Sequence, residues 1–150
     1  MALRQDWKEF IELLNSHHVE YVLVGAFAVS YHATPRNTGD IDFLIRPTVE
    51  NAERMLLVLQ QFGFGSLGIT VEDLIKPGQF VQLGYVPGRI DLLNQISGVE
   101  TEAIWEHRVH GTLQGLSVAY IGRAELIANK RATGRGKDID DLKAMGERLK

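Results

Sequence analysis

The sequence contains no cysteine and no long hydrophobic run. The absence of cysteine excludes disulfides, thiolate metal sites and cysteine nucleophiles, and it suits a reducing compartment. No apolar segment approaches the roughly 18 residues that a membrane-spanning helix needs. The N-terminal stretch is charged within its first few residues and amphipathic. We therefore expect a soluble, cytoplasmic protein with no membrane partner.

Several other site types also lack support. The five histidines show no metal-binding helix pattern, and Ser30 has no evident triad partners. The sequence contains no internal repeat, low-complexity tract or linker. Because 150 residues with 45% hydrophobic content can bury one core but hardly two, residues 1–150 are predicted to form a single domain.

Charge is distributed unevenly along the chain. Residues 1–120 hold 8 Lys or Arg against 14 Asp or Glu, a net charge of −6, whereas residues 121–150 hold 8 against 5, a net charge of +3. A solvated helix face explains most basic runs of this kind. The functional interpretation is that the basic end meets a triphosphate or another anion. Its candidate cations are Lys130, Arg131, Arg135 and Lys137.

Apolar periodicity and turn residues predict an α/β (α+β) protein in which helices and strands are interspersed. Helices are expected over residues 6–18, 26–33, 48–62, 123–132 and 137–149. Strands are expected over residues 21–25, 40–46, 88–96 and 116–122, with another near 79–86 inside a segment rich in glycine and proline.

Two carboxylates stand at the start of the strand predicted over residues 40–46. Side chains alternate along a strand, so Asp40 and Asp42 share one face with their Cα atoms about 6.5–7 Å apart. Their mutual repulsion is best relieved by a divalent cation, and hard oxygen ligands favour Mg²⁺ or Mn²⁺ over Zn²⁺. Asp91 has a similar strand context and can complete the cluster.

Three carboxylates can hold two metal ions, which clamp the attacking and leaving oxygens of a displacement at phosphorus. Gly25 lies between a predicted strand and a predicted helix. A glycine there lets the backbone approach a ligand, and the new helix offers free N–H groups to a triphosphate. The sequence therefore predicts phosphoryl or nucleotidyl transfer from an NTP.

The segment VGAFAVSYHATPRNTGDIDFLI resembles the first active-site motif of the DNA polymerase β-like nucleotidyltransferase superfamily. Within it, the R-x-T-x-D-I-D pattern of residues 36–42 is most similar to small bacterial nucleotidyltransferases related to type IV (AbiEii-like) toxins. The resemblance implies a nucleotidyltransferase fold, with a mixed, strongly twisted sheet flanked by helices that pack mainly on one side. It also implies that Asp40, Asp42 and Asp91 bind the metals and that Asp91 can serve as base for the acceptor hydroxyl.

The same resemblance assigns further residues. A later Lys-Asp motif of the AbiEii-like relatives is matched by Lys137, as a catalytic cation, and Asp138. The implied nucleotide contacts are Gly25, Ala26, Arg36, Thr38 and Asp138.

The chain departs from the family pattern in two ways. Ala26 follows Gly25, so a serine hydroxyl contact to phosphate is lost while the backbone N–H remains. The Gly-Ser-x-Ala-Arg-Gly pattern of minimal antitoxin nucleotidyltransferases is missing. The chain is also short for a second helical domain, so either the acceptor or a partner, such as an antitoxin or a second copy, is expected to complete the site.

The function predicted from the sequence is Mg²⁺-dependent transfer of a nucleoside monophosphate from an NTP to a hydroxyl, with release of pyrophosphate. A toxin-like role would make the acceptor an RNA, such as a tRNA end, or a protein side chain. One alternative is transfer to an aminoglycoside-type drug. Another is a catalytically weak nucleotide-binding regulatory module.

Overall fold

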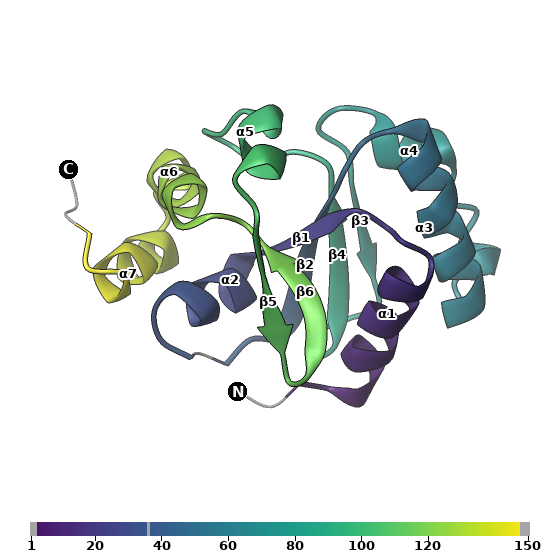
Figure 1. Ribbon diagram of the computed structural model, residues 1–150, viewed down its shortest axis with the longest axis horizontal. Coiled ribbons are helices and arrows are strands. Elements are labelled where there is room, and N and C mark those ends of the chain that lie inside the picture. The colour runs from purple at the N-terminus through teal and green to yellow at the C-terminus, as the bar shows by residue number, and fades with distance from the viewer. Residues whose placement is uncertain (1–2, 36, 148–150) are drawn as a thin grey trace.

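The computed structural model describes residues 3–35 and 37–147, so the predicted contact Arg36 lies outside the described residues. Within them, a six-stranded sheet has the order β3-β4-β2-β1-β6-β5 (Figure 1). The strands are β1 (Tyr21–Val24), β2 (Asp40–Ile45), β3 (Phe80–Leu83), β4 (Arg89–Leu93), β5 (Val109–Leu113) and β6 (Leu116–Tyr120). The helices are α1 (Gln5–Ser16), α2 (Gly25–His32), α3 (Val49–Phe62), α4 (Val71–Ile75), α5 (Thr101–Glu106), α6 (Arg123–Thr133) and α7 (Gly136–Ala144), with a 3₁₀ turn, η1, at Gly65–Leu67.

The sheet is mixed. Strand β1 runs antiparallel to β2 and parallel to β6, and β2 runs parallel to β4. Two antiparallel pairs, β3 with β4 and β5 with β6, form its edges. The prediction of a mixed sheet flanked by helices is confirmed. Helices α4 and α5 were not predicted, because five or six residues are too few to establish a helical period. Strand β5 was also not predicted.

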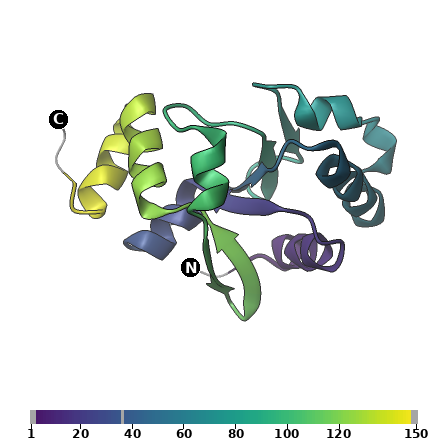
Figure 2. The same ribbon diagram turned by 45° about the horizontal axis from the view of Figure 1, so that its top comes forward.

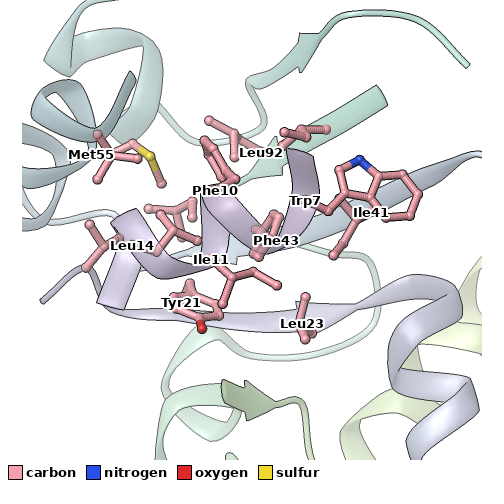
Figure 3. Packing of buried hydrophobic residues seen from close by; sticks show 14 of the residues in the cluster. Trp7, Phe10, Ile11, Leu14, Tyr21, Leu23, Ile41, Phe43, Met55 and Leu92 are labelled. Atoms are coloured by element: carbon pink, nitrogen blue, oxygen red, sulfur yellow. The ribbon is translucent and has the colours of Figure 1, made fainter. Parts of the chain in front are cut away.

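Side-chain alternation divides the core between the two faces of the sheet. On the first face, Leu23, Phe43 and Leu92 pack against Phe10 of α1 and Met55 of α3 (Figure 3). The rings of Phe10 and Phe43 lie 5.5 Å apart, a distance at which aromatic pairs attract. The first face is therefore sealed by α1 and α3.

The second face has its own apolar cluster. Val22, Leu44 and Ala119 from the strands pack with Ala28 of α2 and Leu126 of α6. Figure 2 shows α6 and α7 on the opposite side of the molecule from α1 and α3. Helices therefore cover both faces, and the implication that they pack mainly on one side was wrong.

The second face is left open over the starts of β2 and β4 and over β3. Asp40 and Asp42 point there from β2, and the antiparallel register sets Gln82 of β3 beside Asp91 of β4. Phe80, also on this face, has 61% of its surface exposed. The open part of the sheet forms the floor of a cleft, and this is where the site lies. Among the described residues, no helix has the length and apolarity to cross a membrane.

Candidate active site

The three predicted carboxylates converge at the floor of the cleft. Asp42 of β2 lies directly opposite Asp91 of the parallel strand β4, and Asp40 is two residues earlier on the same face. One oxygen from each carboxylate lies within 4.8 Å of the others. The cleft has a volume of about 510 Å³. Three hard oxygen donors at this spacing suit Mg²⁺ or Mn²⁺.

The surroundings of Asp42 disfavour its charged form. Burial raises its pKa from 3.8 to about 8, helped by the nearby charge of Asp40 and by a hydrogen bond shared with Asp91. The ammonium of Lys137 acts in the opposite direction. Without a metal ion, these surroundings therefore favour the protonated form of Asp42 more than water would. A divalent cation would supply the missing positive charge.

Asp40 is held by two neighbours. The Thr38 hydroxyl donates to Asp40 Oδ1 over 2.9 Å. Arg89, at the start of β4, donates from Nη2 to Asp40 Oδ2 over 2.7 Å. Thr38, predicted as a nucleotide contact, thus orients a carboxylate in this structure.

Arg89 also forms a bidentate salt bridge with Asp91. Its Nε donates to Asp91 Oδ1 over 2.8 Å and its Nη2 to Oδ2 over 3.1 Å. Arg89 was not among the site residues predicted from the sequence. Its position could have been predicted, because alternation along R-I-D places Arg89 on the same strand face as Asp91.

A glycine is required at position 25 both by the backbone conformation there and by the nearby side chain of Asp42. Its φ is +65°, in the left-handed region, and a Cβ built there would lie 2.1 Å from Asp42 Oδ2. The carboxylate of Asp42 occupies the space that any side chain at position 25 would need. A glycine at position 25, predicted from phosphate binding, is therefore required by the position of Asp42.

We expect Gly25→Ala to weaken the binding of a divalent cation such as Mn²⁺, because it displaces Asp42. The left-handed backbone adds a stability cost of about 1–2 kcal/mol. Gly68→Ala is the matched control, since Gly68 has φ +70° and nothing within 4 Å of an added Cβ. Mn²⁺ titration and thermal melting of both variants would test this. Equal Mn²⁺ affinity in the two folded variants would contradict it.

One side of the carboxylates is lined by groups of positive charge or polarity. The N-terminus of α2, with Gly25 and Ala26, lines the cleft and carries no side-chain cap, so its N–H groups can bind phosphate. Lys137 and Arg135, at the start of α7, line the same cleft. Lys137 is exposed and therefore accessible to a ligand in the cleft.

Asp138 does not face the cleft as a nucleotide contact would. It is fully buried, and its carboxylate accepts hydrogen bonds from Lys130 (3.1 Å), Thr133 (2.7 Å) and Arg135 (2.8 Å). Burial alone would raise the pKa of Asp138, but these bonds outweigh it and hold the pKa below its usual range. In this structure Asp138, predicted as a nucleotide contact, joins α6 to α7 and is not among the residues that line the cleft.

Three of the four basic residues proposed to meet an anion are engaged in structural ion pairs, Arg135 through its contact with Asp138. Lys130 is buried, and its Nζ lies 3.0 Å from Asp141 in addition to its contact with Asp138. Arg131 pairs with Glu147 at 2.8 Å. The positive balance of the tail therefore reaches the cleft mainly through Arg135 and Lys137.

The other side of the carboxylates is neutral. It is formed by Phe80 and Gln82 of β3 and by the segment after β4, whose cleft-lining members are Gln95, Ile96 and Ser97. Asn129 of α6 donates to the Ser97 carbonyl over 3.0 Å and closes this end. An exposed aromatic ring among amide side chains can stack on a planar group and hydrogen-bond to its edge.

No protein-family model matches this sequence, and no curated protein matches it significantly. Solved structures do match. The chain superposes on the crystal structure of a Thermotoga maritima protein provisionally described as a nucleotidyltransferase, with a TM-score of 0.60 and 11% identity over 91% of this chain and 88% of that one. It also superposes on an antigenic nucleotidyltransferase-like protein from Paracoccidioides brasiliensis, with a TM-score of 0.58 and 16% identity over 93% and 74% of the two chains.

The chain has the nucleotidyltransferase fold. At 11% and 16% identity, these likenesses describe the fold alone, so the chemistry rests on the residues of this chain. On this nucleotidyltransferase fold, the three carboxylates share one cleft with the uncapped start of α2 and with Lys137.

Proposed function

We propose that the protein is a divalent-metal-dependent nucleotidyltransferase that transfers a nucleoside monophosphate from an NTP to a hydroxyl group. The convergence of Asp40, Asp42 and Asp91 beside the start of α2 carries this proposal. The nucleotidyltransferase fold supports it. In the reaction, the acceptor oxygen forms a bond to the α-phosphorus, the bond between the α-phosphorus and the bridging oxygen breaks, and pyrophosphate leaves.

Each part of the cleft has a role in this reaction. Mg²⁺ or Mn²⁺ held by the three carboxylates would neutralise charge at the reacting phosphate. The N–H groups at the start of α2 bind the triphosphate. Lys137 neutralises charge that develops on the leaving phosphates. Asp91 accepts the proton of the acceptor hydroxyl, since it lies on the strand nearest the neutral side of the cleft.

The lining of the cleft favours an RNA hydroxyl as acceptor. Among the described lining residues, the only acidic side chains are the three carboxylates, so no further acid is present to bind a polycationic drug. Phe80 and the amides of Gln82 and Gln95 provide a stacking surface with hydrogen-bonding groups, which is how proteins bind unpaired bases. A toxin-like role with an antitoxin partner rests on the motif resemblance.

Labelling in a cell lysate tests the proposed activity. The protein is incubated with α-³²P-labelled NTPs and Mg²⁺, and the products are treated with nuclease or protease. We expect nuclease-sensitive label. Protease-sensitive label would assign a protein acceptor instead, and NTP binding without any transferred label would favour the regulatory module.

Lys137 gives a residue-level test. We expect Lys137→Ala to reduce transfer about 10²-fold, because the exposed ammonium at the start of α7 no longer balances charge on the leaving phosphates. Lys143→Ala is the control, since it removes an exposed lysine from the last turn of the same helix. Equal rates for the two variants, measured with the labelled NTP, would remove Lys137 from the mechanism.

A further inference from the structure

We propose that Arg89 is a built-in counter-cation that competes with the divalent metal ion for Asp40 and Asp91 and moves to the nucleotide phosphates when the metal binds. This inference rests on the metal site of the proposed function. It assigns to Arg89 a positioning role that couples metal binding to nucleotide binding.

The hydrogen bonds around the cluster give the first reason. Arg89 donates to both oxygens of Asp91 and to Oδ2 of Asp40, over 2.7 to 3.1 Å. Thr38 donates to the remaining Asp40 oxygen over 2.9 Å. All four oxygens of these two carboxylates therefore already accept a hydrogen bond. For three of the four, the donor is the guanidinium of Arg89.

The second reason is electrostatic. A Mg²⁺ ion lies about 2.0–2.1 Å from its oxygen ligands. If Arg89 kept its bonds to Asp40 and Asp91, the metal ion and the guanidinium would be close neighbours of the same sign. Their repulsion weakens metal binding unless Arg89 leaves.

Arg89 can move without disturbing the strand. Its backbone N–H and that of Gly88 both donate to the Gly39 carbonyl, over 3.2 and 2.9 Å, which fixes the start of β4 beside β2. The side chain is 26% exposed and lines the cleft. Rotation about its side-chain bonds is therefore sufficient to release the carboxylates.

The released guanidinium has a suitable partner in the proposed substrate. Arginine binds phosphate with two parallel hydrogen bonds, as it binds Asp91 in this structure. Hydrogen bonds to the phosphates of an NTP would therefore replace those that Arg89 loses to Asp40 and Asp91. We infer that metal alone binds weakly and that metal and nucleotide bind cooperatively.

Mn²⁺ binding to the full chain, measured by calorimetry without nucleotide, tests the competition. We expect Arg89→Gln to bind Mn²⁺ about tenfold more tightly than the original chain, because the competing cation is gone. Arg89→Lys, which keeps the charge but loses the two-pronged contact, should fall between them. Arg54→Gln, which removes an exposed arginine on α3, controls for net charge and should leave the affinity unchanged.

Two further measurements make the test decisive. In metal-free buffer, Arg89→Gln should melt at a lower temperature than Arg54→Gln, and Mn²⁺ should raise its melting temperature more. A non-hydrolysable NTP analogue should increase Mn²⁺ affinity more in the original chain than in Arg89→Gln. Unchanged or weaker Mn²⁺ binding by both Arg89 variants would overturn the proposal and leave Arg89 as a support for the ligands.

Failure of the proposed role of Arg89 can be distinguished from failure of the proposed function. Calorimetry without nucleotide requires no transfer, so a chain that transfers nothing can still show tighter Mn²⁺ binding by Arg89→Gln. Conversely, transfer that is lost in Asp42→Asn would support the enzyme even if Arg89 did not compete with the metal.

Discussion

Asp42→Asn is expected to abolish nucleotidyl transfer while making the metal-free protein more stable. The proposed transfer should fall at least about 10²-fold, because a carboxylate proposed to bind the metal ion is lost. The gain in stability follows from the raised pKa of Asp42, which means that its charged form is disfavoured in the folded chain. We expect a gain of more than about 1 kcal/mol near pH 8, or at least ~3 °C in melting temperature.

The stability of the metal-free chain is expected to fall as the pH rises. Between the unfolded pKa of about 4 and the folded value of about 8, the folded chain holds a proton on Asp42 that the unfolded chain has lost. This group therefore lowers stability progressively as pH rises through that range and has no further effect above it. Thermal melting of the metal-free chain from pH 5 to 9 should show this loss, and Asp42→Asn should lack it.

Asp40→Asn is the matched comparison. It should also lose transfer, but without the gain in stability, because Asp40 is ion-paired with Arg89 and accepts a bond from Thr38. Two outcomes would refute this reading: near-normal transfer in either variant, or an equal rise in melting temperature in both.

Lys130→Ala is expected to destabilise the chain more than any single change at the cleft surface. It would leave Asp138 and Asp141 buried with a lost partner. Breaking a buried ion pair costs about 3–5 kcal/mol, which corresponds to a fall of roughly 10 °C in melting temperature. Denaturant unfolding and thermal melting measure the loss.

Lys143→Ala is again the control, since it removes an exposed lysine from α7 and should leave stability nearly unchanged. A loss below about 1 kcal/mol for Lys130→Ala would mean that the buried network does not stabilise the junction of α6 and α7.

The strands and the carboxylates were predictable for the same reason. A period of two along residues 40–46 sets both the buried face of β2 and the shared direction of Asp40 and Asp42, so one pattern gives the strand and the site. Asp91 could be assigned to the cluster because it lies in a similar apolar strand.

The partners of the charged groups were not predictable. Asp138 and Lys137 are adjacent in the sequence, but one is buried against α6 and the other is exposed at the cleft. Only the packing of α7 on α6 decides between these environments. The contact of Arg89 with Asp40 likewise depends on the parallel pairing of β2 with β4, which joins residues 49 positions apart.

The register of β2 against β4 has a consequence for how this chain can vary in length. Because side chains alternate, a slip of one residue in β2 would exchange Asp42 with Ile41, and the same slip in β4 would exchange Asp91 with Ile90. Either slip would bury a carboxylate in the core of the first face and turn an isoleucine toward the cleft. A single-residue insertion in either strand would therefore eliminate the site and disrupt the core together. Length changes that preserve the site should be confined to surface connections such as residues 65–68, which are exposed.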